Sequence, residues 1–501
     1  MEFTRRDLLK FTSGGMAGLV FTPAPWKLLK DSSLVSENWP GVPQPKQAEM
    51  HTRYTTCTLC PAGCGVCARC VGDQPVSLAG VPGHPAGRGA LCANGLLGHH
   101  LPFCAGRARR VLAGGRPSPV DDVVARVRAA IAQRGPREPV AILDARPGRV
   151  ASQIYRQFLQ KAGQGIYCAP AGSQPYGPFG IDLENTRAIL SFGVPVLDGW
   201  LSPGRVLQNR GHFQLIQVEA TRSRTASLAD LWISIPASAE ADFMAAVACA
   251  LQGGAADARA MGVARLLQAN QPAIVIGAGA GKLNALLGNA GRPGGFLLRR
   301  DYAPAADLSD VPDGSISVLL AEETALPWAL LQRKLAPRAT VVALTSWLDG
   351  YAQHADFVVP APLYLECLDE VPTPAGATAA GFSLSPPLIP GLAGTMAPPE
   401  FVLRLAGDST AYPDLLKQRV TALRKEGRGS VFSYADAKST RVRDLSSGDD
   451  IWKLMLGGAA WTDDPLPQRS AGPPLFAAEW NLKLRKTPLM SKLYQESGLR
   501  S

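Results

Sequence analysis

A chain of 501 residues with 46% apolar content has room for about two to four domains with ordinary cores, which excludes a disordered or fibrous protein. The formal net charge of +10 fits a soluble protein with a positive surface, which could also meet an anionic membrane or an acidic electron-transfer partner. The basic residues are scattered, without a basic stripe that aromatic residues interleave, so no nucleic-acid-binding module is expected.

The N-terminus resembles an export signal. Residues 4–10 read TRRDLLK, a twin-arginine pattern, and an apolar run from Phe11 to Phe21 follows them. Three glycines interrupt this run, and neither it nor any later apolar stretch reaches the roughly 20 residues that span a bilayer. We therefore expect a twin-arginine signal in residues 1–30 and a linker in 31–49, with the start of a basic amphipathic helix as the alternative. No clear cleavage site follows, so the signal could remain as an uncleaved anchor.

The ten cysteines are distributed unevenly along the chain. An exported protein invites a disulfide framework, but such a framework would spread its cysteines more evenly. Six of the ten lie within residues 57–92, and the other four are single and far apart: Cys104, Cys168, Cys249 and Cys367. This distribution favours a metal site in the dense segment.

The dense segment contains the pattern Cys57-x2-Cys60-x3-Cys64, and Cys92 follows after twenty-seven residues. A cubane iron–sulfur cluster needs four thiolates, and a short loop can present three of them while a distant residue supplies the fourth. We therefore predict that these four cysteines bind one [4Fe–4S] cluster. A four-thiolate zinc site is the alternative, since zinc accepts similar spacings.

Cys67 and Cys70 continue the same run. They could substitute as ligands, form a disulfide or be small buried hydrophobic residues. The last interpretation is favoured, because free cysteine is often a core residue.

Short β-rich runs alternate with helical stretches through the middle of the chain. A helix is expected at 154–161, and strands are expected at 140–143, 213–218, 273–277, 316–320 and 340–344. This alternation predicts an α/β protein with doubly wound parallel sheets. The glycines in 277–281 follow a strand and could cradle a phosphate, although such a turn is more often only a turn. Residues 372–399 are rich in Pro, Gly and Ala and predict a long loop, and the last hundred residues look charged and irregular.

Several motifs together resemble the molybdopterin oxidoreductase superfamily, over nearly the whole chain. They are HPAGRGALCANG at 84–95 around the fourth cysteine, DLEN at 182–185 with AILSFG at 188–193, TRSRTA at 221–226, LLGN at 286–289 with RPGG at 292–295, and ADFVVPA at 355–361 with Glu366. The segments PWKLL at 25–29, ENWP at 37–40 and SKLYQES at 491–497 resemble one branch more closely. That branch contains polysulfide and thiosulfate reductases, and within it the likeness is to molybdopterin-like subunits of periplasmic menaquinone reductase and alternative complex III.

The resemblance implies a division of the chain into domains. A small N-terminal [4Fe–4S] domain is expected at 50–113. Two interleaved doubly wound parallel-sheet domains should follow, one split between 114–165 and 300–385 and one inserted at 166–299. Residues 386–501 would be a truncated C-terminal region and tail. Only 135 residues follow Glu366, so the C-terminal β-barrel domain of the superfamily is expected to be largely absent.

Two further departures from the superfamily concern the pterin cofactor. Asn94 stands where active members usually have a lysine between cluster and pterin, and ASAE at 237–240 replaces a glycine-containing loop that binds guanine. Together with the missing barrel, these departures argue against a bound molybdopterin guanine dinucleotide. If one were bound, the resemblance places five residues around it: Gly193, Glu219, Arg224, Glu240 and Gly277. Cys168 would then be a possible molybdenum ligand, although an isolated cysteine after a β-rich pair is more often buried and inert.

The sequence thus predicts an iron–sulfur electron-transfer and scaffold subunit of a membrane quinone oxidoreductase complex, rather than an independently catalytic enzyme. A twin-arginine signal implies export of the folded protein to the periplasmic side of the cytoplasmic membrane. The resemblance implies three partners: a further iron–sulfur subunit, an integral membrane quinone-binding subunit and a multihaem cytochrome c. The alternatives are a catalytic molybdenum or tungsten oxidoreductase of the polysulfide or thiosulfate reductase type, and a zinc-containing structural protein. Hydrolytic chemistry has no support, because the six histidines form no HExxH or Ser–His–Asp pattern.

Overall fold

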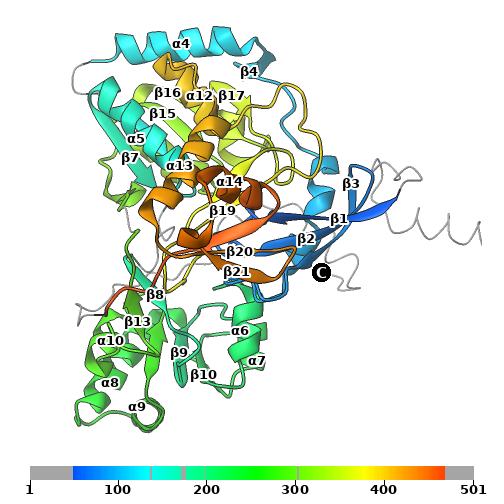
Figure 1. Ribbon diagram of the computed structural model, residues 1–501. Coiled ribbons are helices and arrows are strands. Elements are labelled where there is room, and N and C mark those ends of the chain that lie inside the picture. Colours follow the sequence, from blue (N-terminus) through cyan, green and yellow to red (C-terminus); the bar gives the residue numbers. More distant parts are fainter. Residues whose placement is uncertain (1–48, 136–137, 171–176, 198, 302–303, 469–501) are drawn as a thin grey trace, which may run out of the picture.

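The computed structural model describes residues 49–135, 138–170, 177–197, 199–301 and 304–468. The expected signal at 1–30, nearly all of the linker and the motif at 491–497 lie outside these residues. Figure 1 shows a large upper body, a smaller lower body and an N-terminal sheet at one side, with a further sheet between them. No helix in the described ranges is both long and apolar enough to cross a membrane.

The N-terminal sheet is a three-stranded antiparallel meander. Its strands are β1 (Met50–Thr56), β2 (Gly65–Val71) and β3 (Gln74–Gly80). The pairing of β1 with β2 ends at Thr56 and Gly65, so the eight residues between them form the hairpin loop that carries three of the predicted ligands. A short helix α3 (Ala93–Leu96) and a 3-10 turn η1 (Gly98–Phe103) follow the sheet.

The upper body is built on an eight-stranded sheet. Its order is β14 (Ala306–Asp307), β7 (Gly165–Ala169), β6 (Val140–Leu143), β15 (Ile316–Glu322), β16 (Leu335–Thr345), β17 (Phe357–Pro360), β4 (Leu112–Ala113) and β5 (Arg116–Pro117). The first six strands run parallel, and β4 and β5 add an antiparallel edge. Because β7 belongs to this sheet, the split unit extends past the expected boundary at 165.

Helices cover both faces of this sheet, which explains why its central strands are apolar throughout. Ile142 and Leu320 face a core shared with α4 (Val120–Gln133), α5 (Val150–Ala162) and α12 (Pro398–Ala406). Their neighbours Ala141 and Leu319 face the opposite core, to which α11 (Trp328–Lys334) contributes Leu331.

The lower body contains a four-stranded parallel sheet in the order β11 (Leu231–Ile233), β10 (Gln214–Val218), β9 (Ala188–Phe192) and β12 (Ala273–Ile276). Its helices are α6 (Pro203–Asn209), α7 (Arg224–Ser227), α8 (Glu240–Leu251), α9 (Ala258–Ala269) and α10 (Gly281–Leu287). A two-stranded ribbon of β8 (Phe179–Ile181) and β13 (Phe296–Leu298) belongs to the same core. The two parallel sheets confirm the predicted α/β class.

A five-stranded antiparallel sheet corrects two expectations. Its order is β18 (Asp369–Val371), β19 (Gly381–Ser385), β22 (Ala459–Thr462), β20 (Ser430–Ser433) and β21 (Lys438–Arg441). Residues 372–399 are therefore not one long loop, and the C-terminal region is not irregular up to 468. It also contains α13 (Tyr412–Glu426) and α14 (Gly448–Leu456).

The reason for both differences is long-range pairing. The core that buries Phe382 of β19 and Trp461 of β22 also contains α12, α13 and the upper sheet, so these short strands gain stability from distant segments. Within the described residues this sheet is open, with β18 and β21 at its ends, and no closed barrel forms.

Candidate iron–sulfur centre

Three of the predicted ligands lie in the β1–β2 hairpin loop. Cys57 follows β1, and its amide donates a hydrogen bond of 2.8 Å to the carbonyl of Cys64, directly before β2. This bond closes the loop and turns the intervening residues around a common centre. The backbone amide of Ala62 lies 3.4 Å from the sulfur of Cys60, to which it donates a hydrogen bond. Amide donors of this kind stabilise the negative charge of a metal-bound thiolate.

Two glycines allow the loop to approach its surroundings closely. Gly63 has a φ of +56°, and a Cβ at this position would lie 2.8 Å from Val371. Gly87 belongs to the segment that leads to Cys92, and a Cβ there would lie 3.3 Å from the Cα of Cys64. The segment around the fourth cysteine therefore packs directly on the hairpin loop.

His84 holds that segment in place. Its Nδ1 accepts hydrogen bonds from the amides of Ala86 at 3.2 Å and Gly87 at 2.8 Å. Burial lowers the pKa of His84 to about 3, so the ring is neutral and can accept these bonds. Its Nε2 lies 3.1 Å from the hydroxyl of Tyr434, next to β20, which ties the segment to the five-stranded sheet.

The structure brings the four predicted cysteines together. Burial raises the pKa of the Cys64 thiol well above its usual range, and the neighbouring sulfurs of Cys60, Cys57 and Cys92 raise it further. Four thiolates so close repel one another, and iron supplies the positive charge that offsets this repulsion. The donor set thus fits a [4Fe–4S] cluster.

A single metal ion and a cubane cluster place different demands on their ligands. Within the described ranges, no three His, Cys, Asp or Glu side chains converge as the ligands of a single ion do. A cubane takes one thiolate at each of its four iron corners, so its ligands stand apart from one another.

Tyr364 is a further residue of this site that the sequence analysis did not single out. It follows β17 in the loop that leads to Glu366, and its phenol is buried. It packs in the same core as Cys57 and Cys64, and burial and then the sulfurs of Cys57, Cys64 and Cys92 raise its pKa well above the usual range. In the sequence, the feature that could have pointed to Tyr364 is its position two residues before Glu366, which belongs to a motif of the superfamily.

The other cysteines of the dense segment lie along β2. Cys70 is fully buried, and Cys67 packs against a small core that contains Val81, Phe432 and Tyr434. The largest causes of the raised pKa of Cys64 are burial and the sulfurs of Cys60, Cys57 and Cys92, and neither Cys67 nor Cys70 is among them. All ten cysteines are free thiols, so no disulfide framework is present.

Cys168 lies apart from the four thiols. It is fully buried on β7, where its thiol contacts the carbonyl of Ile142 at 3.5 Å. Burial, followed by the charges of Asp144 and Asp307, raises the pKa of Cys168 to about 12. The thiol is therefore protonated and enclosed by core residues, which is a poor environment for a molybdenum ligand.

Two departures from the superfamily pattern concern the pterin cofactor, Asn94 and the segment ASAE at 237–240, and the structure describes both. Asn94 lies in α3, two residues after Cys92, where it is buried, and its side-chain oxygen has no hydrogen-bond partner in the described part of the chain. Ser238 lies in the 3-10 turn η2 (Ala237–Ala239) directly before α8. Asparagine is too short to extend from the cluster as lysine would, so the link expected in active members is not made by this residue.

The five residues expected around a pterin dinucleotide all lie at the carboxyl edge of the lower parallel sheet. Three directly follow β9, β10 and β12, and two begin α7 and α8: Gly193, Glu219, Gly277, Arg224 and Glu240. The strand order reverses between β9 and β12, and open α/β sheets bind ligands at such a point. The structure therefore groups these residues where a ligand of this sheet would lie.

The carboxyl edge of the lower sheet carries two carboxylates, those of Glu219 and Glu240. The Glu219 carboxylate accepts hydrogen bonds from the amide of Ser223 at 3.0 Å and from Gln217 Nε2 at 2.9 Å. Burial and the nearby charge of Glu219 raise the pKa of Glu240. Gly193 has a φ of +63° with open space around it, whereas a Cβ at Gly277 would lie 2.8 Å from Phe192.

The corresponding edge of the upper sheet is filled by a buried ion network. Its strand order reverses between β6 and β15, where Asp144 and Glu322 end the strands. Arg149 lies between them, with Nη2 2.8 Å from Asp144 and 2.5 Å from Glu322. Tyr155 donates to Glu322 at 3.2 Å, and Ser152 donates to Asp144 at 2.5 Å. Burial would raise the pKa of Asp144, but Arg149 and the Ser152 hydroxyl outweigh burial and lower it.

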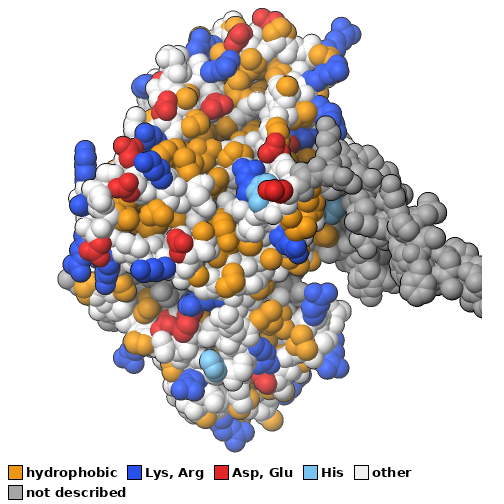
Figure 2. All heavy atoms as spheres, turned by 45° about the vertical axis from the view of Figure 1, so that its right-hand side comes forward, with side chains coloured by type: hydrophobic (Ala, Val, Ile, Leu, Met, Phe, Trp, Pro, Cys, Tyr) orange, Lys and Arg blue, Asp and Glu red, His pale blue; other side chains and the backbone are white. Residues whose placement is uncertain are grey.

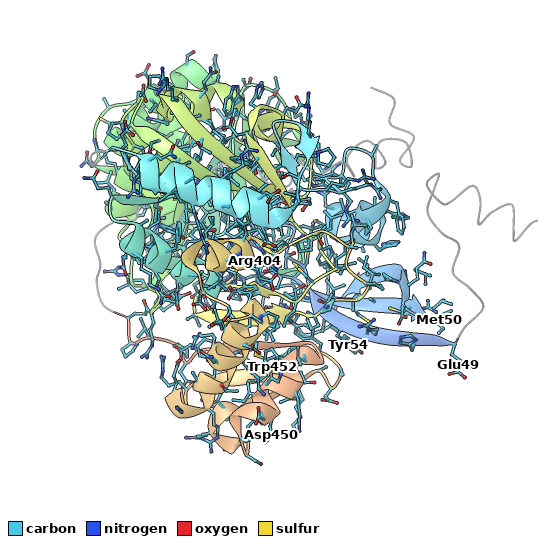
Figure 3. All side chains as sticks on the ribbon, turned by 90° about the horizontal axis from the view of Figure 1, so that it is seen from above. Glu49, Met50, Tyr54, Arg404, Asp450 and Trp452 are labelled. Atoms are coloured by element: carbon cyan, nitrogen blue, oxygen red, sulfur yellow. The ribbon has the colours of Figure 1, made fainter. Side chains whose placement is uncertain are left out.

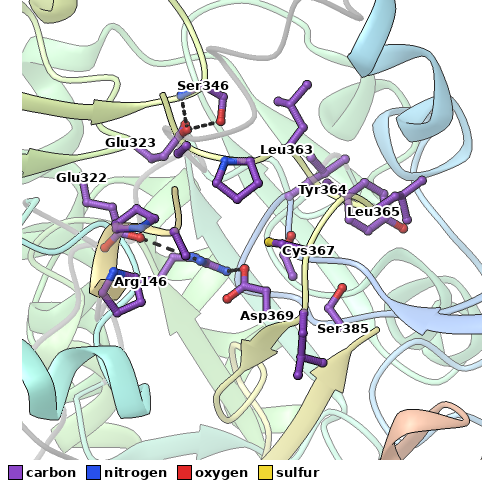
Figure 4. Close-up of a pocket in the computed structure, with 18 of the residues that line it drawn as sticks. Arg146, Glu322, Glu323, Ser346, Leu363, Tyr364, Leu365, Cys367, Asp369 and Ser385 are labelled. Carbon is purple, nitrogen blue, oxygen red and sulfur yellow. Dashed lines mark hydrogen bonds and ion pairs between the residues drawn. The ribbon is translucent and has the colours of Figure 1, made fainter. Parts of the chain in front are cut away.

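The network continues toward β18. Arg146 forms an ion pair of 2.8 Å with Asp369 and lies 3.8 Å from Glu322. Glu370 accepts hydrogen bonds from the first two amides of α5, at 2.9 and 3.0 Å, and from the hydroxyl of Tyr412 at 2.6 Å. Figure 4 shows Arg146 between Glu322 and Asp369 in the pocket that remains beside Tyr364.

The space left around this network is small. The two cavities that flank Arg146 have volumes of about 80 and 100 Å³. Pockets for drug-sized ligands usually enclose roughly 300–1,000 Å³. Each cavity beside Arg146 is therefore smaller than a usual ligand pocket.

Three comparisons with known proteins complete the description. Residues 50–101 match the molybdopterin oxidoreductase Fe4S4 domain. The chain is similar to the menaquinone reductase molybdopterin-binding-like subunit of Nitratidesulfovibrio vulgaris, with 26% identity over 563 aligned positions that cover 91% of this chain and 80% of the relative. The fold is similar to that of acetylene hydratase from Pelobacter acetylenicus, with a TM-score of 0.58, 13% identity, and coverage of 89% of this chain and 78% of that protein. The chain thus carries a molybdopterin oxidoreductase Fe4S4 domain on an α/β body whose fold is similar to that of acetylene hydratase.

Proposed function

We propose that this protein is an iron–sulfur electron-transfer and scaffold subunit of a membrane quinone oxidoreductase complex, and that it works without molybdopterin. The Fe4S4 domain and the four gathered thiols support a one-electron relay through a [4Fe–4S] cluster. The relative is named as a subunit of menaquinone reductase, which supports a place in a quinone-linked complex.

The observation that carries the proposal is the filled edge of the upper sheet. An anionic dinucleotide needs a water-excluding pocket lined with unpaired donors. At the reversal point between β6 and β15, Arg149 and Arg146 are instead paired with Asp144, Glu322 and Asp369 of the chain itself. Buried charges that already have partners give an incoming phosphate no net gain.

The setting of the subunit is part of the proposal. The twin-arginine pattern supports export of the folded chain to the periplasmic side of the membrane. There it would contact a further iron–sulfur subunit, an integral membrane quinone-binding subunit and a multihaem cytochrome c. Figure 2 shows Lys and Arg side chains spread singly over the visible face, with apolar side chains between them, which suits docking onto protein partners better than binding a polyanion.

The metal content of the anaerobically purified native complex tests this proposal. We expect about four irons in this chain, as one cubane requires, with no stoichiometric molybdenum or tungsten by mass spectrometry. Acid oxidation should release no fluorescent pterin. About one equivalent of molybdenum or tungsten in this subunit would instead support the catalytic oxidoreductase, with the lower-sheet edge around Gly193 and Glu219 as its cofactor site.

Export is tested separately by replacing Arg5 and Arg6 together with lysine. The twin-arginine signal is recognised as a motif rather than as positive charge, so the variant should stay in the cytoplasm with its cluster assembled. Cell fractionation followed by immunoblotting measures the distribution. Undiminished export of the double variant would contradict the assignment of residues 1–30 as a twin-arginine signal.

A further inference from the structure

Tyr364 lies in a tight turn that other parts of the chain hold in one conformation. Glu366 forms a buried ion pair with Arg107, and its carboxylate also accepts a hydrogen bond of 3.0 Å from the amide of Leu363. Leu365 has a φ of +76°, which is strained for a residue with a side chain. Its carbonyl accepts hydrogen bonds of 2.8 and 3.1 Å from the amides that follow Pro387, and these bonds stabilise the strained turn.

The ring of Tyr364 is confined as firmly as its backbone. Gly98, at the start of η1, faces the ring so closely that a Cβ there would lie 2.6 Å from Cε1. The ring packs in the same apolar core as Leu59, Cys57 and Cys64. Its position is therefore fixed by the cluster domain on one side and by the turn on the other, and Figure 4 shows it on the wall of the small pocket.

The hydroxyl of Tyr364 is buried in the core that contains two of the predicted ligands, Cys57 and Cys64. It has no hydrogen-bond partner in the described part of the chain. Cys57 and Cys64 belong to the same buried core, and the charges of their sulfurs, with that of Cys92, raise the pKa of Tyr364. A buried hydroxyl without a partner costs free energy, and a thiolate that carries cluster charge is an acceptor that removes this cost.

We propose that Tyr364 donates a hydrogen bond to the Cys57 thiolate and thereby raises the reduction potential of the cluster. This inference rests on the proposed function, since it requires the [4Fe–4S] cluster. Reduction adds one negative charge to the cluster and its ligands, so a fixed donor stabilises the reduced state more than the oxidised one. Tyr364 is then a residue that sets the potential at which this subunit passes electrons, without being a ligand.

The test is a redox titration of the cluster in Tyr364→Phe, followed by EPR. This change removes one hydroxyl and keeps the ring that packs against Gly98. We expect the ratio of reduced to oxidised cluster at a given potential to fall about tenfold, which is a shift of about 59 mV to lower potential for one electron. The matched control is Tyr351→Phe, an equally buried tyrosine that donates to the carbonyl of Ala321 in another core and should leave the potential unchanged.

A second variant tests the same hydrogen bond by moving the ring of Tyr364 instead of removing its hydroxyl. Gly98→Ala pushes the ring away from its position without changing its chemistry, and it should lower the potential in the same direction. Equal potentials in the wild-type protein and both variants would overturn the inference while leaving the cluster itself established. A wild-type protein without a reducible cluster would instead contradict the proposed function on which the inference rests.

Discussion

Cys64→Ser should leave the protein without a reducible [4Fe–4S] cluster, whereas Cys70→Ser should keep it. Cys64 is the predicted ligand whose pKa the other three sulfurs raise, and a serine hydroxyl there is a hard, weakly acidic ligand in place of a soft thiolate. The measurement is the S = 1/2 EPR signal of the reduced protein together with its iron content. We expect the EPR signal to disappear and the iron content to fall from about four atoms per chain to a small fraction of that value.

The control is closely matched in this experiment. Cys70 is as deeply buried as Cys64, undergoes the same substitution and lies on the strand that follows the loop. Loss of the cluster in both variants would mean that the EPR signal reports general stability rather than ligation. A preparation with stoichiometric zinc and no iron after anaerobic assembly would restore the four-thiolate zinc alternative.

Arg149→Ala should lower the free energy of unfolding by about 3–5 kcal/mol, because it leaves buried Asp144 without its countercharge and Glu322 with only Arg146, at 3.8 Å. The Arg149 side chain is only 1% exposed and is paired with Asp144 and Glu322, which are equally buried. Its Nε also donates to the carbonyl of Arg146 at 2.8 Å, so the change removes a backbone contact at the start of α5. Urea unfolding followed by circular dichroism measures the difference.

Arg404→Ala provides the comparison. Arg404, labelled in Figure 3, pairs with Asp121 at 3.3 Å, but the two side chains are 50% and 86% exposed. A pair of this kind contributes less than about 1 kcal/mol. If Arg149→Ala were no more destabilising than this surface change, the upper edge would not be closed by its own charges, and the case against a pterin there would lose its main support.

The sequence predicted what depends on local spacing. The three cysteines of the hairpin loop and the fourth ahead of α3 could be predicted as one ligand set, because ligand spacing within one segment constrains where the sulfurs can meet. The parallel sheets could be predicted because their central strands, such as Val140–Leu143 and Ala273–Ile276, are apolar runs between helical stretches.

The sequence did not predict what depends on distant partners. The strand β19 lies among prolines and glycines and gains its stability from β22, so composition alone suggests a loop. Tyr364 becomes part of the cluster site only because Arg107 and Glu366 fix a turn against it. Asp144, Arg149 and Glu322 look like ordinary surface charges until the sheet places the first and last of them on adjacent strands.

The cluster domain forms hydrogen bonds with residues late in the chain, and this has a consequence for how the protein is made. Thr56, beside the first ligand, bonds to Tyr434 at 2.9 Å across 378 residues, and Arg53 donates to the carbonyl of Leu388 at 2.8 Å across 335 residues. At about 5–20 residues per second, a ribosome needs about 20–75 s to cover the longer of these separations. The cysteine loop thus leaves the ribosome long before the segments around Leu388 and Tyr434, which pack against its domain, have been synthesised. Enclosure of a cluster therefore comes late, only after the C-terminal residues that contact the cluster domain have been synthesised.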